Sequence, residues 1–226
     1  MRKTKFDIFM PAGGIGRRLG GITKNKPKPL IKIFNKEFIF YVIKSLLKID
    51  IDTLNLMVSY KKDSFKNIKF DKISTKLIVD KRRSGTFNCL YSIKGKINKN
   101  FIYSNSDEIL DINLNKCIKL FNKTKADVLQ LYFINRDGNN LTESFILNKK
   151  KFKKNKNYTE AGLKIFSKNI FKIKIKKNYK NIEDFINDNK DRIKIKILII
   201  DNRPFSIDTA KRITRTKKYL KSKIKF

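Results

Sequence analysis

The residues from Ala12 to Leu30 carry the clearest chemical pattern in the chain. They read Ala-Gly-Gly-Ile-Gly-Arg-Arg-Leu-Gly-Gly-Ile-Thr-Lys-Asn-Lys-Pro-Lys-Pro-Leu. Glycines allow backbone amides to approach a phosphate chain closely, where a Cβ atom would clash. Arg17, Arg18 and Lys28 add fixed positive charge to the same loop. A loop with open amides and several cations is suited to binding a polyphosphate.

The spacing of this loop excludes two common phosphate-binding motifs. A dinucleotide fingerprint that begins at Gly14 needs a glycine at position 19, where the chain has Leu19. A Walker motif that begins at Gly16 reaches Gly21, but Ile22 follows where a lysine is required. The pattern that remains is GG-x-G-x-R-L followed by T-x-x-x-P-K-P-L.

The absence of histidine limits the chemistry further. No Ser-His or Cys-His nucleophile pair and no imidazole base can form. Cys89 and Cys117 lie in segments with helical patterns, so we expect small buried thiols in a reducing cytoplasm. Phosphoryl or nucleotidyl transfer needs only positioning, cations, metals and carboxylates, and it fits this composition.

Two carboxylates are candidate metal ligands. Asp107 follows a short apolar run, at the predicted carboxyl end of a strand, where open α/β sheets bind ligands. Asp208 comes just before the C-terminal helical pattern. Mg²⁺ prefers such oxygen ligands and also binds substrate phosphates and water. The alternative for each residue is a helix cap or an Asx turn.

The formal net charge of +35 has two explanations. One is nucleic-acid binding, because basic proteins attract phosphate backbones. The other is compositional bias, because 45 of the 55 basic residues are lysines, spread from Lys3 to Lys225. We favour the second explanation and expect no specific nucleic-acid partner. The charge still attracts anionic nucleotides and sugar phosphates.

Strand and helix patterns alternate along the chain, which predicts one α/β domain over residues 1–226 with a mostly parallel sheet. No apolar run is long enough to cross a membrane, so no membrane insertion is expected. Residues Asn148–Asn157 are nearly all Lys and Asn, which predicts a solvated loop or an edge hairpin. The predicted strands are Phe6–Met10, Leu54–Val58, Leu77–Val79, Phe101–Ser104, Val128–Phe133, Glu160–Phe166 and Ile193–Ile200. The predicted helices are Phe38–Leu47, Thr86–Ile93, Asn113–Phe121 and Lys211–Lys221.

The Gly-rich loop resembles the signature of the sugar-phosphate nucleotidylyltransferases, and the likeness continues along most of the chain. The further matching segments, in order, are Val58-Ser59-Tyr60, Asp80 to Ile93 with Ser84-Gly85-Thr86, Asn105-Ser106-Asp107, Glu160-Ala161-Gly162-Leu163 and Ile207-Asp208-Thr209-Ala210. In length and motifs the chain resembles short members such as heptose-1-phosphate guanylyltransferases. Ser106 departs from the usual Gly, and no clear Glu-Lys motif precedes the sugar strand.

The resemblance implies a three-layer, Rossmann-like (GT-A-like) fold with a mostly parallel mixed sheet. It implies a cytoplasmic enzyme that joins an NTP to a sugar-1-phosphate, releases pyrophosphate and forms an NDP-sugar for surface polysaccharide or lipopolysaccharide precursors. The implied catalytic residues are Arg17, Lys28 and Asp107. The implied nucleotide-binding residues are Ala12, Gly13, Gly14, Gly16, Arg17, Gly85 and Thr86. Glu160 and Gly162 are the implied sugar-binding residues, and Asp107 and Asp208 the implied Mg²⁺ ligands.

Two other functions remain open at this point. A phosphocholine-type cytidylyltransferase shares the first motif, but it needs a cage for a quaternary amine. A basic RNA-binding protein without catalysis is the second alternative. The sequence does not identify the sugar, the base or the oligomeric state.

Overall fold

The computed structural model describes residues 5–14, 16–71, 73–81, 84–134, 144–148, 151–155, 158–175 and 178–223. For residues 17, 22, 144–148 and 151–155 it describes the backbone alone.

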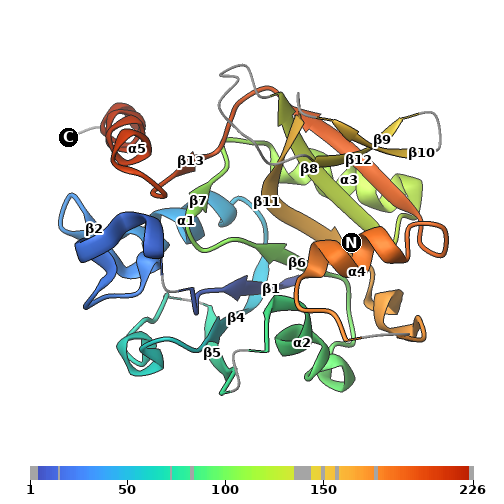
Figure 1. Cartoon of the computed structure of the whole chain (residues 1–226), viewed down its shortest axis with the longest axis horizontal. Coiled ribbons are helices and arrows are strands. Elements are labelled where there is room, and N and C mark those ends of the chain that lie inside the picture. The colour runs from blue at the N-terminus through green and yellow to red at the C-terminus, as the bar shows by residue number, and fades with distance from the viewer. Residues whose placement is uncertain are drawn as a thin grey trace.

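A seven-stranded mixed sheet forms the centre of the fold, in the order β12-β8-β11-β6-β1-β4-β5 (Figure 1). Its strands are β1 (Phe6–Pro11), β4 (Ile51–Val58), β5 (Ser74–Val79), β6 (Phe101–Ser104), β8 (Val128–Ile134), β11 (Tyr158–Phe166) and β12 (Ile195–Ile200). Strand β11 runs antiparallel to both of its neighbours, while the other pairs are parallel. The mostly parallel mixed sheet is therefore confirmed.

Apolar residues alternate along the strands and build two cores, one on each face of the sheet. In β1, Ile8 and Met10 join one core while Phe9 joins the other. Helices α1 (Phe38–Leu46), α3 (Leu114–Thr124) and α5 (Ala210–Lys223) contribute to the first core, and α2 (Thr86–Tyr91) and α4 (Ile182–Asp188) to the second. This arrangement confirms the three-layer architecture.

Short elements connect the sheet to the helices. Two small antiparallel pairs are β2 (Lys32–Ile33) with β3 (Lys36–Glu37), and β7 (Glu108–Ile109) with β13 (Phe205–Ser206). The 3₁₀ segments are η1 (Arg17–Thr23), η2 (Lys28–Leu30), η3 (Lys62–Phe65), η4 (Lys94–Lys96) and η5 (Lys168–Lys172). The β7–β13 pair is important for the site, because it joins the segment after β6 to the segment before α5.

The structure also refines the sequence expectations. Within the Lys/Asn-rich segment, β10 (Lys151–Asn155) pairs antiparallel with β9 (Ser144–Asn148), which precedes the segment except for Asn148, so the described backbone agrees with the hairpin alternative rather than the loop. The predicted helix from Thr86 ends at Tyr91 rather than Ile93, and β4 and β5 each begin three residues earlier than expected. Helix α4 was not predicted. Its apolar positions Ile182, Phe185 and Ile186 give only a short periodic signal.

Candidate active site

The Gly-rich loop follows β1 at the edge of the sheet where the neighbouring parallel strands also end. A cavity of about 420 Å³ opens beside it. The lining comes from the loop, η2, the turn after β6, the start of α2 and the segment before α5: Pro11, Ala12, Gly14, Gly16, Arg18, Lys28, Pro29, Thr86, Asn105, Ser106, Asp107 and Asp208. Segments far apart in sequence thus meet at the carboxyl edge, where α/β sheets bind ligands.

Gly16 has a structural role in the loop. Its φ of +69° lies in the left-handed region, and an added Cβ would lie 2.9 Å from the Thr23 methyl group. Thr23 in turn donates its hydroxyl to the carbonyl oxygens of Gly16 (3.0 Å) and Gly20 (3.2 Å). Gly14, in contrast, has no atom within 4 Å of its would-be Cβ. Gly16 and Thr23 therefore close the loop, while Gly14 leaves open space for a ligand.

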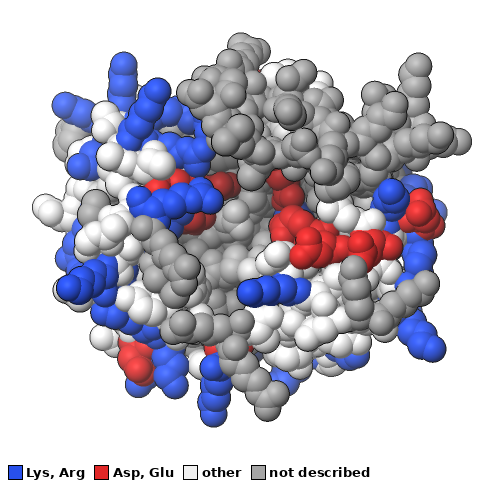
Figure 2. All heavy atoms as spheres, viewed as in Figure 1, with Lys and Arg blue, Asp and Glu red and all other residues white. Residues whose placement is uncertain are grey.

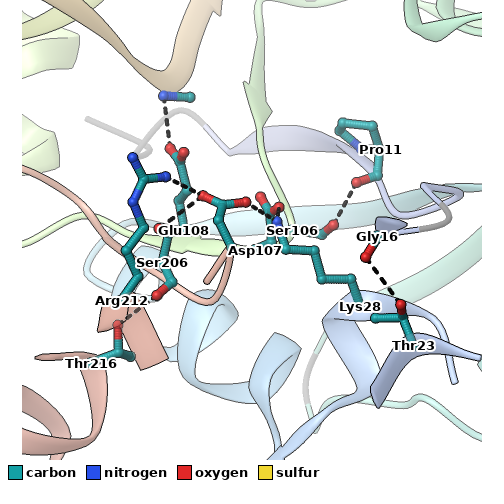
Figure 3. A network of polar contacts seen from close by, with 12 residues as sticks. Pro11, Gly16, Thr23, Lys28, Ser106, Asp107, Glu108, Ser206, Arg212 and Thr216 are labelled. Atoms are coloured by element: carbon teal, nitrogen blue, oxygen red, sulfur yellow. Dashed lines mark hydrogen bonds and ion pairs between the residues drawn. The ribbon is translucent and has the colours of Figure 1, made fainter. Parts of the chain in front are cut away.

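Three charged side chains meet on the wall of the cavity (Figure 3). The ammonium of Lys28, which lies in η2 between two prolines, donates to the carboxylates of both Asp107 and Asp208. All three side chains are at most 23% exposed. The two candidate metal ligands therefore share one cation, although a hundred residues separate them in sequence.

Neighbouring groups hold each carboxylate in place. Ser106 donates its hydroxyl to the carbonyl oxygen of Pro11 (2.5 Å), which ties the turn carrying Asp107 to the end of β1. Asp208 accepts hydrogen bonds through Oδ2 from Ser206 (3.0 Å) and from Nη1 of Arg212 (2.6 Å). The serine that replaces the expected glycine at position 106 thus supports the site.

The electrostatics of the cluster follow from these contacts. Burial alone would lower the pKa of Lys28, but the charges of Asp107 and Asp208 raise it above its ordinary value. Burial would raise the pKa of Asp208, whereas Lys28 and Arg212 hold it below the ordinary value. Near neutral pH, Lys28 is therefore cationic and Asp208 is anionic.

A second cavity, of about 270 Å³, adjoins the first and shares Pro11, Gly14 and Thr86 with it. Its other lining residues are Gly13, Met57, Val58, Ser59, Asp80, Gly85 and Cys89. Gly85 has a φ of +99°, and an added Cβ would lie 2.3 Å from the Lys180 carbonyl oxygen. Asp80 provides a carboxylate at this cavity and accepts a hydrogen bond from Ser84 (3.1 Å).

Gly162, a predicted sugar-binding residue, is connected to the cluster of Lys28, Asp107 and Asp208 by a hydrogen bond to Glu108. Its N–H donates to Oε2 of Glu108 (3.1 Å), the residue that follows Asp107. An added Cβ at Gly162 would lie 2.1 Å from Nδ2 of Asn105, so only glycine lets these side chains pack over β11. Burial, followed by the charges of Asp107 and Asp208, raises the pKa of Glu108 to about 8.

Glu160, the other predicted sugar-binding residue, belongs to an ionic cluster around the buried side chain of Lys164. The ammonium of Lys164, which is 1% exposed, donates to Glu160 and to Oε1 of Glu183 (2.8 Å). Burial alone would lower the pKa of Lys164, but the two carboxylates raise it well above its ordinary value. Figure 2 shows acidic side chains gathered over α4, the helix that carries Glu183, beside the hollow of this face.

The structure brings most predicted residues together. Ala12, Gly14, Gly16, Lys28, Thr86, Asp107 and Asp208 line the first cavity, and Gly13 and Gly85 line the second. Glu160 and Gly162 line neither, and the side chain of Arg17 lies outside the described residues. Arg18, its neighbour, does line the first cavity.

Sequence reasoning missed Glu108, Lys164, Glu183 and Arg212. A lysine inside the apolar strand Ala-Gly-Leu-Lys-Ile-Phe was a usable signal, because a buried charge needs a partner. Arg212 lies four residues after Asp208, and this i,i+4 spacing of opposite charges was a usable signal for an ion pair.

The described residues contain no helix that is both apolar enough and long enough to span a bilayer. They also contain no group of three or more Asp, Glu, Cys or His side chains arranged to hold a metal.

Comparisons with known proteins identify the family of this chain. The chain is 29% identical to the D-glycero-alpha-D-manno-heptose 1-phosphate guanylyltransferase of Campylobacter jejuni over 202 residues, covering 84% of this chain and 89% of that protein. It is 29% identical to the choline-phosphate cytidylyltransferase of Streptococcus pneumoniae, but over only 40% of each chain. The crystal structure of HddC from Yersinia pseudotuberculosis complexed with GMP-PN has the same fold, with a TM-score of 0.78, 20% identity and coverage of 95% of this chain and 99% of that one. Residues 10–196 match the family model described as Nucleotidyl transferase, and the chain belongs to that family.

Proposed function

We propose that this protein transfers GMP from GTP to a sugar-1-phosphate, releasing pyrophosphate and forming a GDP-sugar. The observation that carries the proposal is the cluster of Lys28, Asp107 and Asp208 on the wall of the cavity beside the Gly-rich loop. The relationship to heptose-1-phosphate guanylyltransferases supports it.

In this reaction an oxygen of the sugar phosphate attacks the α-phosphorus of the nucleotide. The bond from that phosphorus to the β-phosphate oxygen breaks, and the electron pair leaves with pyrophosphate. Negative charge grows on the α-phosphoryl oxygens and on the leaving group, so catalysis consists mainly of positioning and electrostatic stabilisation.

The basic residues of the first cavity match this demand. Arg18 lines the cavity, and a planar guanidinium can donate two hydrogen bonds to phosphate oxygens. Arg17 remains a predicted partner of the β- and γ-phosphates. Lys28 supplies a point charge for the α-phosphate or for the incoming sugar phosphate.

The pair of carboxylates fits a Mg²⁺ ion. Asp107 and Asp208 already converge on one positive group, and oxygen ligands from one or two carboxylates plus substrate phosphates are what Mg²⁺ prefers. When bound there, the ion would neutralise charge on the phosphates. The protein would contribute one ligand after β6 and one before α5.

The choice of GTP is based on Asp80 in the second cavity. A carboxylate offers two acceptor oxygens and no donor. Guanine presents two adjacent donor groups, its ring N–H and its amino group, which together can satisfy both oxygens. Uracil and thymine have a single ring N–H, which lies between two carbonyl groups. The oxygens of these carbonyls would repel the oxygens of the carboxylate. Asp80 therefore favours guanine over these bases.

The experiment is a matrix of four NTPs against sugar-1-phosphates and phosphocholine, with pyrophosphate release as the readout. We expect release with GTP and a heptose- or hexose-1-phosphate, and its loss in Asp107→Asn. Asp80→Asn should weaken selection of GTP, while Asp71→Asn, an exposed residue, should leave it unchanged. Release only with CTP and phosphocholine would replace this proposal with the cytidylyltransferase function, and no release with any pair would refute it.

A further inference from the structure

Lys28 occupies the position between the two carboxylates that the metal ion requires. Its ammonium donates to Asp107 and to Oδ1 of Asp208, while Oδ2 of Asp208 is held by Ser206 and Arg212. Both carboxylates are therefore neutralised before any substrate binds. A divalent cation that enters this position meets an ammonium already bound to the oxygens it needs.

Lys28 and a divalent cation would compete for the oxygens of Asp107 and Asp208. Asp107 and Asp208 carry two negative charges, and Lys28 and Arg212 carry two positive charges at direct contact distance. The cluster is neutral, so it offers little net attraction to free Mg²⁺. If Lys28 moves away, one negative charge returns and both carboxylates become available.

The phosphates of a bound nucleoside triphosphate would attract the ammonium of Lys28 away from the carboxylates. Lys28 lines the cavity beside the Gly-rich loop, where a triphosphate would bring several negative charges. Pro27 and Pro29 flank Lys28 and restrict its backbone. An exchange of partners would therefore take place in the flexible four-carbon side chain, which can turn from the carboxylates to a phosphate.

We propose that Lys28 is a placeholder that blocks the metal site until the nucleotide binds, so that the metal and the NTP bind cooperatively. This inference rests on the proposed function for the identity of the nucleotide. It adds that the same lysine controls access of the metal to Asp107 and Asp208. Coupling of this kind is reciprocal, so the metal also strengthens binding of the nucleotide.

The test measures binding of Mn²⁺ to the full chain without any nucleotide, by electron paramagnetic resonance of the free ion. Mn²⁺ favours the same oxygen ligands as Mg²⁺. Wild-type protein should bind it weakly. Lys28→Met should bind at least about tenfold more tightly, a shift in the usual range of coupling between sites. Lys28→Arg retains the charge and should stay near the wild type, and Lys32→Met, an exposed lysine on the same segment, should not change the affinity.

The double variant Lys28→Met/Asp107→Asn assigns the gain to the carboxylate pair, and it should lose the added affinity. Equal Mn²⁺ affinity in the wild type and Lys28→Met would overturn the inference, as would a gain that persists in the double variant. If Lys28→Met does not fold, Lys28→Gln provides the same comparison.

The outcome is independent of the catalytic assay. Pyrophosphate release without a gain of Mn²⁺ affinity in Lys28→Met would refute the placeholder and leave the proposed function intact. A gain dependent on Asp107 without pyrophosphate release from any substrate pair would support the placeholder and refute the proposed function.

Discussion

Replacing Lys164 with methionine should destabilise the fold more than any exposed lysine substitution. The ammonium of Lys164 is 1% exposed and contacts Glu160, which is 19% exposed, and Glu183, which is 45% exposed. Methionine has a similar length and no charge, so the substitution removes the cation and keeps most of the volume. Two carboxylates then face each other across a poorly solvated space between β11 and α4.

The expected magnitude follows from the burial of each partner. Removing one partner of a buried ion pair costs about 3–5 kcal/mol, because the remaining charge stays buried without compensation. Glu183 is 45% exposed, so solvent screens the repulsion that its charge contributes. We therefore expect the free energy of unfolding to fall by about 3 kcal/mol, at the lower end of that range.

Urea denaturation at pH 7.5 measures this loss. Lys168→Met is the matched control, because Lys168 is exposed at the start of η5, after the same strand. Its unfolding free energy should stay within about 0.5 kcal/mol of the wild type. A loss below about 1 kcal/mol in Lys164→Met, with unchanged m-value, would refute the reasoning that the cluster depends on this charge.

The pH dependence provides an independent check of the same cause. In Lys164→Met, burial and mutual repulsion should raise the pKa of Glu160 and Glu183 in the folded state above the unfolded value of 4.5. The folded state then binds more protons than the unfolded state, so stability falls as pH rises. The deficit of the variant should accordingly be smaller at pH 5 than at pH 8. A deficit that does not change with pH would assign the loss to packing alone.

Three further predictions concern the site. Arg17→Ala and Arg18→Ala should each fold normally, and kcat should fall by about 10²–10³ in the variant that removes the phosphate-binding arginine. A near-normal kcat in both folded variants would show that neither arginine takes part in the chemistry. Gly162→Ala should displace Asn105 and lower kcat/KM for the acceptor by roughly 10²-fold; unchanged acceptor kinetics would contradict that geometry. The folded-state pKa of Asp208 lies below its ordinary value of 3.8, so its ionised form stabilises the fold above pH 3.8. The difference in unfolding free energy between the wild type and Asp208→Asn should therefore vanish as the pH falls through the folded-state pKa. A difference that persists at pH 2 would contradict the ion-pair assignment.

Local pattern was sufficient to predict the loop and the sheet. The glycines of residues 12–21 predict a turn that could bind phosphate, because close backbone approach needs the absence of a Cβ atom. Alternating apolar segments predicted a mostly parallel sheet, and the carboxyl edge of such a sheet is where Asp107 and Lys28 meet.

Contacts between distant segments could not be predicted from the pattern. The β7–β13 pairing brings Asp208 beside Asp107, but each strand has only two residues, too few to show periodicity. The hydrogen bond from Ser106 to Pro11 depends on how two loops approach each other in space.

We expect Asp107 and Asp208 to act together at one cation site during nucleotidyl transfer. The most direct test is a double-mutant cycle on kcat for pyrophosphate release, with Asp107→Asn, Asp208→Asn and the double variant at saturating Mg²⁺. If both carboxylates serve one ion, the double variant should be little slower than the slower single variant. Rate losses that multiply in the double variant, or full activity of the wild type in EDTA, would contradict the account.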